Sequence, residues 1–251
     1  MPLYVQALLW GLLAGSALVI GAALASVARI PQRLIAAVMA FGAGVLISAL
    51  SFELIDVAHK RGGLVSTAIG FLLGAVAFTT ANVWISHSGG HHRKRSGDHL
   101  QKKAREGGGL AIAVGALFDG IPESVTIGVG LLADRNVGLV AVAAVFLSNL
   151  PEGLSSATGM RKAGRSNAYI FGVWGSIALA CGVAAMLGNM LLAQADPAII
   201  AVALAIAAGA ILAMIVDTMI PEAFETTHEY AGLITVIGFL AAFALSKFTD
   251  H

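Results

Sequence analysis

The chain has 251 residues, of which 58% are hydrophobic and only 12% are charged, and its mean hydropathy is +0.86. This composition excludes an ordinary soluble domain and makes a lipid bilayer the expected solvent. The net charge of +1 also excludes the concentrated basic surface of a nucleic-acid-binding protein. The expected partner is therefore membrane lipid, and no nucleic acid is expected to bind.

Apolar runs follow one another along the whole chain, and most have the length that an α-helix needs to cross roughly 30 Å of hydrocarbon. They predict helices over residues 4–28, 34–58, 64–86, 109–132, 137–159, 168–193, 198–222 and 231–248. Glycine, alanine and serine inside these runs let helix backbones approach closely. We therefore expect an all-α integral membrane protein whose residues 1–251 form a single bundle of eight transmembrane helices.

The first run carries no Lys or Arg before Arg29, so it lacks the basic start of a cleaved signal and is expected to be the first membrane helix. The single cysteine, Cys181, lies inside an apolar run and is expected to pack there. No intramolecular disulfide is therefore expected.

Basic residues are unequally divided between the two sets of alternate connections. Eleven of the 15 Lys and Arg residues lie in the connections after the first, third and fifth helices, and four lie on the other side. By the positive-inside rule the eleven are cytoplasmic. The prediction is a multi-pass cell-membrane protein with both termini extracytoplasmic, and the short loops and compact size favour a bacterial inner membrane.

The third connection, about residues 88–107, is rich in His, Lys and Arg and has no apolar periodicity, so a flexible cytoplasmic loop is expected. The connection contains three histidines, His91, His92 and His99, and His87 lies just before it. They offer imidazole ligands for loose binding of a transition metal. The alternative is a solvated basic loop without a binding role.

Seven acidic residues lie in or at the ends of the predicted spans, where no Lys or Arg accompanies them: Glu53, Asp56, Asp119, Glu123, Glu152, Asp217 and Glu222. A carboxylate in the bilayer core costs about 3 kcal/mol even on lenient scales, so such residues are candidates for function. Each needs a proton or a nearby cation.

The fourth and fifth predicted helices each place polar side chains on one face. Asp119 and Glu123 are four residues apart, which puts both carboxylates about 40° from one another around the helix. On the next helix, the polar side chains on one face are those of Ser148, Asn149 and Glu152. These five residues near mid-membrane are the central candidates for cation ligands.

A proline precedes the glutamate on both helices. Pro122 and Pro151 lack the N–H that would bond four residues back, so the carbonyl oxygens of Phe118 and Leu147 are freed. In a membrane such oxygens persist only where something satisfies them, and a cation in the bundle interior would do so. Carboxylate, amide and carbonyl oxygens together suit divalent ions.

Acids at helix ends suggest gates on either side of that central site. Glu53 and Asp56 lie near the outer end of the second helix, and Asp217 and Glu222 near the inner end of the seventh. The last two are five residues apart, about 140° around a helix, so they cannot both face one site. The alternative for these helix-end acids is that they are solvated by water and have no role in function. It applies to Glu53, Asp56 and Glu222.

The Pro-Glu pairs resemble those of the ZIP (Zrt/Irt-like) family of divalent-metal transporters, whose fourth helix typically reads His-Asn-x-Pro-Glu-Gly. The matching stretches are 119–124 (DGIPES) and 148–153 (SNLPEG). Asp119 stands where the family has a metal-binding His, and Gly120 where it has Asn. The seventh helix resembles Glu-x-Ile-Pro-Glu, with Thr218 at the first Glu and Asp217 one residue earlier.

The resemblance implies three, two and three helices, with the first and last three related by inverted topology. It also implies a two-metal site between the fourth and fifth helices and transport of zinc, iron, manganese or cadmium into the cytoplasm, without catalysis. The Asp in place of His favours an oxygen-preferring ion such as manganese or iron. The loss of Asn at Gly120 argues against a full second site. The expected metal ligands are Asp119, Glu123, Ser148, Asn149 and Glu152, with Asp217 as an additional ligand and Glu53 and Asp56 as entrance ligands.

Three other classes compete with this hypothesis. An intramembrane enzyme is disfavoured because no His-Glu-x-x-His, Gly-x-Gly-Asp or Gly-x-Ser-x-Gly motif occurs. A proton-coupled carrier of another small solute would use the same acids as titrating groups. A metal-responsive membrane sensor would bind the ion without transporting it.

The small-residue faces of the helices also suit a homodimer.

Overall fold

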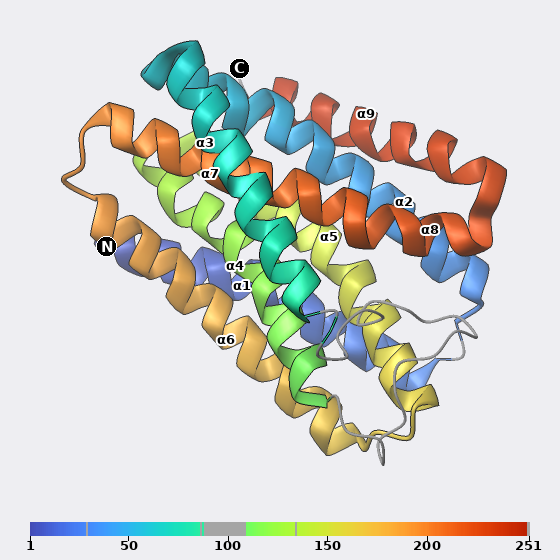
Figure 1. Cartoon of the computed structure of the whole chain (residues 1–251). Helices are drawn as coiled ribbons and strands as arrows, with labels where there is room; N and C mark the ends of the chain where they lie inside the picture. The colour runs from blue at the N-terminus through green and yellow to red at the C-terminus, as the bar shows by residue number, and fades with distance from the viewer. Residues whose placement is uncertain (29, 86, 88–108, 134, 250–251) are drawn as a thin grey trace.

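The computed structural model describes residues 1–28, 30–85, 87, 109–133 and 135–249. These residues are helical nearly throughout and include no β-strand (Figure 1), which confirms the predicted all-α class. The predicted flexible loop at 88–107, with three of its histidines, lies outside the described residues. The chain ends labelled N and C lie at the same end of the helical bundle (Figure 1).

The first part of the chain forms three helices and a π-helical turn. They are α1 (Leu3–Val27), α2 (Gln32–Ala49), the turn η1 (Leu50–Ile55) and α3 (Asp56–Ile85). Pro31 comes directly before α2. Proline is tolerated at the start of a helix because the backbone N–H that it lacks would have no partner within the helix there. Gly63 interrupts α3 with a φ of 73°, a conformation that glycine adopts at little cost.

The middle of the chain forms α4 (Gly109–Ala133) and α5 (Arg135–Lys162), each with its predicted proline inside the helix. The last part forms α6 (Asn167–Leu192), α7 (Pro197–Met214), the π-helical turn η4 (Ile215–Met219), α8 (Ile220–Thr227), the 3₁₀ turn η5 (His228–Tyr230) and α9 (Ala231–Thr249). Ser166 caps α6 by accepting a hydrogen bond from the backbone N–H of Tyr169.

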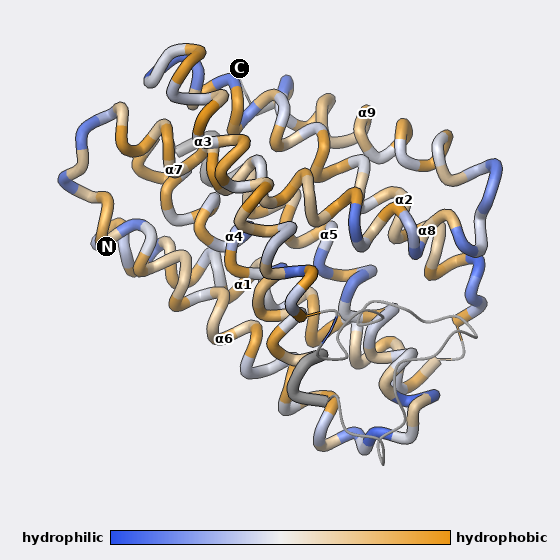
Figure 2. Tube along the Cα trace, viewed as in Figure 1, coloured by the Kyte–Doolittle hydropathy of each residue, from blue (hydrophilic) through white to orange (hydrophobic). Residues whose placement is uncertain are grey.

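Five helical stretches of the described residues are long and apolar enough to cross a membrane: Leu3–Val27, Gln32–Ile85, Ala113–Ala133, Asn167–Leu192 and Pro197–Phe248. The second and fifth have 54 and 52 residues and run on through the π-helical turns. Figure 2 shows that the helices are hydrophobic over most of their length and that hydrophilic residues gather at the turns. The fold is thus compatible with a multi-pass membrane protein.

The helices pack in a few long pairs. α3 lies along α7, α2 lies along α9, α1 packs against α5 and α6, and α4 packs against α6. Between α2 and α9, a Cβ added to Gly44 would lie 1.9 Å from the carbonyl oxygen of Thr235, and one added to Gly238 would lie 2.1 Å from that of Phe41. The contact is reciprocal: Thr235 lies three positions before Gly238, and Phe41 lies three positions before Gly44. No larger residue fits at either glycine.

The same reciprocal contact joins α3 to α7. A Cβ at Gly74 would lie 1.9 Å from the carbonyl oxygen of Ile206, and one at Gly209 would lie 1.9 Å from that of Phe71. Again each carbonyl belongs to the residue three positions before the partner glycine. The two interfaces are therefore built alike, although they join different parts of the chain.

Candidate cation-binding site

The α4 helix buries both of its predicted ligands, because Asp119 and Glu123 are each only 1% exposed. Hydroxyl groups beside them bond to the helix backbone: Ser124 Oγ donates to the carbonyl of Gly120 over 2.7 Å, and Thr126 Oγ1 donates to that of Glu123 over 2.6 Å. Acidic groups are rarely buried to this degree without a compensating charge or hydrogen bonds. Both carboxylates of the predicted pair therefore lie inside the helical bundle.

The α5 helix likewise buries Ser148, Asn149 and Glu152, none of them more than 3% exposed. Ser148 Oγ donates to the carbonyl of Val145 over 3.0 Å. The side-chain nitrogen of Asn149 donates to the carbonyl of Ala14 on α1, also over 3.0 Å. One of the predicted ligands on α5 is thus held by a helix that the sequence did not connect with the site.

The side-chain oxygen of Asn149 is the most informative polar atom in this region. It is buried, and no described residue donates a hydrogen bond to it. Leaving such an oxygen without a donor costs about 1–3 kcal/mol. The nitrogen of the same amide is held by Ala14, so the orientation of the group is fixed. A cation, or a water molecule bound to one, would satisfy this oxygen.

Cys181 on α6 borders the same region, although the sequence indicated only a packing role for it. It is 2% exposed, its Sγ lies 3.9 Å from the carbonyl oxygen of Gly120, and it interacts electrostatically with Glu123 and Glu152. Both glutamates therefore lie near one side chain of α6. Sequence reasoning missed this contact because nothing local links residues on separate helices.

The absence of a side chain at Gly120 has a structural reason. A Cβ at this position would lie 3.0 Å from the Sγ of Cys181, so a larger residue would displace the thiol. Gly120 stands at the position where the resembled family has Asn. The thiol therefore occupies the space toward which a side chain at 120 would extend.

Glu53 lies in the η1 turn and is 8% exposed. Ser246 of α9 donates a hydrogen bond to its Oε1. Glu53 also lines a narrow cavity of about 10 Å³ with Thr126 of α4 and Val145 of α5, enough for about one water molecule. Glu53 therefore lies close to the two helices that carry the buried acids, although none of those acids lines this cavity.

Asp56 and Asp217 lie outside this buried group. Asp56 pairs with Lys60 over 2.6 Å, and its side chain is 45% exposed. Asp217 is exposed and accepts a hydrogen bond of 3.4 Å from the side chain of Asn82 on α3. The described structure therefore does not bring these two predicted ligands to the acids of α4 and α5.

Glu222 is the buried acid that the predicted ligand set omitted. It is 4% exposed and accepts a 3.1 Å hydrogen bond from Ser155, three residues after Glu152 on α5. Asp217 lies within the preceding η4 turn, and the two carboxylates have opposite environments, as their spacing predicts. The third Pro-Glu pair, Pro221 and Glu222, was the sequence signal for this residue.

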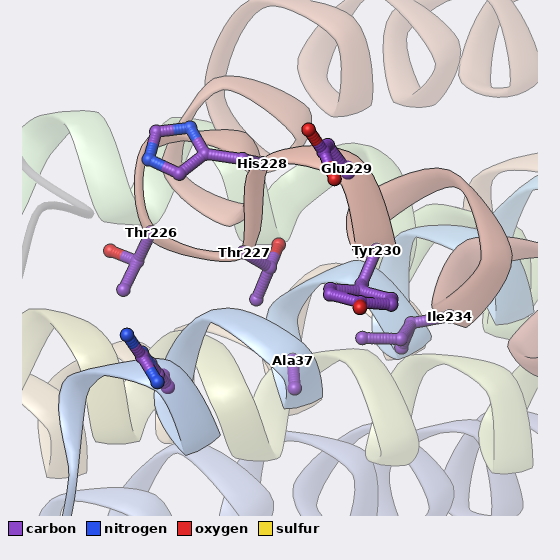
Figure 3. Close-up of a pocket in the computed structure, with 8 residues that line it drawn as sticks. Ala37, Thr226, Thr227, His228, Glu229, Tyr230 and Ile234 are labelled. Atoms are coloured by element: carbon purple, nitrogen blue, oxygen red, sulfur yellow. The ribbon is translucent and has the colours of Figure 1, made fainter.

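A wider pocket of about 760 Å³ lies elsewhere, at the turn from α8 to α9 (Figure 3). Its lining is Arg33, Ala37, Thr226, Thr227, His228, Glu229, Tyr230 and Ile234. It contains none of the predicted metal ligands, so cavity size alone does not locate the candidate site. Among the described residues no three His, Cys, Asp or Glu side chains converge closely enough to hold a metal ion. A cation between α4 and α5 would need amide, hydroxyl, carbonyl or water oxygens as well.

Comparison of the sequence with protein-family models and with curated proteins finds no match. The fold and the buried groups define a helical protein with several long apolar helices, compatible with a multi-pass membrane protein, that buries carboxylates from at least three of its helices.

Proposed function

We propose that this chain is a membrane transporter of the ZIP type that carries a divalent transition metal, such as zinc, iron, manganese or cadmium, into the cytoplasm. The observation that carries the proposal is the buried oxygen of Asn149, which no described residue satisfies and which lies on the same helical face as Glu152. Buried carboxylates on the facing helix α4 supply the negative charge that attracts a cation.

The metal is held, in this proposal, by a mainly oxygen ligand set. Its members are Asp119, Glu123, Ser148, Asn149 and Glu152. Carboxylate and amide oxygens bind manganese and iron well and bind zinc without strict selection for it. Glu53 serves as an entrance ligand, because it lines a small cavity together with Thr126 of α4 and Val145 of α5. Asp56 and Asp217 stay predicted ligands nearer the surface.

The proposed architecture has eight membrane crossings arranged as three, two and three. Two stretches of 54 and 52 residues are each long enough to cross twice, and each contains one non-helical break, at Gly63 and at His228. These breaks are 165 residues apart in the chain (63 to 228), as are the starts of the two π-helical turns (50 to 215). This regular spacing supports a repeat that relates the first three crossings to the last three.

The helix pairs support the same repeat. If α1, α2 and α3 correspond to α6, α7 and α9, and α4 to α5, the pair α2–α9 corresponds to α7–α3, and α1–α5 to α6–α4. All four pairs are packed in the structure. The glycine contacts follow this exchange, with Gly44 corresponding to Gly209 and Gly238 to Gly74. Inverted repeats of this kind place a substrate site near the middle of the membrane.

The test is uptake of each of the four metals into proteoliposomes that contain the purified full chain. The variants Glu123→Gln and Glu152→Gln remove one buried charge each, and Glu229→Gln removes a charge from an exposed glutamate as the matched control. Saturable uptake that is lost in the first two variants and kept in the control supports the proposal and ranks the ions.

Two results would overturn it. Unchanged uptake in both buried-site variants would refute the proposed ligands. No uptake of any metal by the native chain would refute metal transport, and proton movement driven by another solute would then identify a proton-coupled carrier. Metal binding without uptake would identify a sensor.

A further inference from the structure

A pocket of about 390 Å³ lies between the C-terminal ends of α1 and α5. Its described lining consists of two cationic side chains, one hydroxyl group and three apolar residues: Arg161, Lys162, Thr158, Ala25, Ala28 and Ile30. No Asp or Glu is among the described lining residues. The pocket therefore combines positive charge with apolar surface, and it contains none of the predicted metal ligands.

The way in which α5 ends fixes the backbone of both cationic residues. Gly164, with a φ of 83°, donates its N–H to the carbonyl of Arg161 over 3.0 Å. The N–H of Arg165 donates to the carbonyl of Met160, also over 3.0 Å. These two bonds make a Schellman motif, in which a glycine in the left-handed conformation ends a helix. Arg161 and Lys162 thus hold defined positions in the last turn of α5.

The guanidinium group of Arg161 is attached to the other wall of the pocket. Its Nη1 donates a hydrogen bond to the carbonyl of Ala25, in the last turn of α1. The last four carbonyls of a helix have no partner inside the helix, so this bond supplies a donor and places a cation at the negative end of the helix dipole. A guanidinium group has five N–H donors, and the bond to Ala25 uses one. The remaining donors suit a phosphate group, which arginine binds through two parallel hydrogen bonds.

The pocket lies at the level where hydrocarbon gives way to lipid headgroups. The apolar run of the first predicted span ends at residue 28 and that of the fifth at residue 159, and the lining residues flank both ends. By the positive-inside rule this end is expected to face the cytoplasm. Basic pockets between membrane helices at this level bind the headgroups of anionic lipids.

An ordinary basic helix end would explain the charge of this region but not the pocket. Arg33 provides the contrast, because it is also exposed and lies on the same expected side of the membrane. The pocket that Arg33 lines also contains Glu229, whose negative charge would weaken the binding of an anion. Of these two pockets, only the one between α1 and α5 has a described lining without an acid.

We propose that this pocket binds the phosphate group of an anionic phospholipid from the cytoplasmic leaflet. Arg161 and Lys162 contact the phosphate, and the three apolar lining residues contact the glycerol backbone and the first methylene groups of the acyl chains. Such a lipid would bridge α1 and α5, which are also joined by the hydrogen bond from Asn149 to Ala14. The inference goes beyond metal transport and does not depend on it.

Native mass spectrometry of the purified, delipidated full chain tests the inference, with phosphatidylglycerol as the anionic lipid and phosphatidylcholine as the neutral one. The native chain is expected to bind one phosphatidylglycerol about tenfold more tightly than phosphatidylcholine. Arg161→Gln is expected to remove most of this preference, and Lys162→Gln to weaken phosphatidylglycerol binding about threefold. Arg33→Gln is the matched control, because it removes the same charge outside the pocket and should leave the affinity unchanged.

Three results would overturn the proposal. Equal loss of affinity in all three variants would show that net charge alone attracts the lipid. Equal affinity of the native chain for the two lipids would show that the phosphate is not bound through the cations. Displacement of phosphatidylglycerol by millimolar inorganic phosphate would identify a site for free phosphate instead of lipid. Lys162→Gln keeps the test valid if Arg161→Gln does not fold, because it leaves the bond to Ala25 intact.

Discussion

The side-chain nitrogen of Asn149 on α5 donates a 3.0 Å hydrogen bond to the main-chain carbonyl of Ala14 on α1. Asn189 on α6 makes the same kind of bond, over 2.9 Å, to the carbonyl of Gly128 on α4. Both asparagines are buried, at 1% and 2% exposure. Only Asn149 shares a helical face with Glu152, so the two asparagines make a matched pair that separates helix packing from ion binding.

Asn149→Ala and Asn189→Ala are each expected to destabilise the protein by about 1 kcal/mol, because each removes one hydrogen bond between helices. Only Asn149→Ala is expected to raise the KM for metal uptake, by about tenfold, which corresponds to about 1.4 kcal/mol. Thermal unfolding in detergent and uptake kinetics in proteoliposomes measure the two effects. Equal KM values for both variants would show that Asn149 only joins helices.

Ser155→Ala is expected to lower stability by about 1–3 kcal/mol, since it takes a hydrogen-bond donor away from the buried carboxylate of Glu222. Thr158→Ala is the control, because the Thr158 hydroxyl donates to Leu154 in its own helix, and a change within about 0.5 kcal/mol is expected there. Unfolding by denaturing detergent measures both. A similar loss in the two variants would mean that the Ser155 bond does not stabilise Glu222.

Gly21→Ala is expected to weaken the contact between α1 and α5, because the new Cβ would lie 2.4 Å from the carbonyl oxygen of Leu150. Forcing the helices apart should cost about 1–3 kcal/mol. Gly172→Ala on α6 is the matched control, with no atom within 4 Å of its new Cβ, and should change stability by at most about 1 kcal/mol in the favourable direction. Thermal unfolding curves of the two variants would be compared, and a tolerated Gly21→Ala would disprove the tight contact.

His228→Gly is expected to stabilise the protein by about 1 kcal/mol, because His228 has a φ of 42° and a ψ of −111°, which cost little only for glycine. The substitution also removes an edge contact of its ring with Phe224, but that contact is exposed and weak. Gly63→Ala, at the corresponding break with a φ of 73°, should have the opposite effect. A lower melting temperature for His228→Gly would show that the ring contact outweighs the backbone strain.

The sequence predicted the helices closely, but it predicted the surroundings of the site residues only in part. The apolar run at 109–132 became α4 (Gly109–Ala133), and the run at 137–159 became part of α5 (Arg135–Lys162). That Asp119 and Glu123 face the same way was also predictable, since residues four apart share a helical face, and both are buried. The opposite environments of Asp217 and Glu222 followed from their spacing, but which of them is buried did not.

By itself, the sequence determined where helices form and which acids share a face of one helix, because hydrophobic length and the spacing of residues on one helix are local properties. Only the tertiary structure decided that Asn149 reaches Ala14, that Cys181 faces Gly120, and that Ser155 holds Glu222. These contacts join residues 135, 61 and 67 positions apart. They depend on how each helix is rotated about its axis, and one residue added in a π-helical turn changes that rotation by about 100°. Packing against neighbouring helices, rather than any local preference, selects the final rotation.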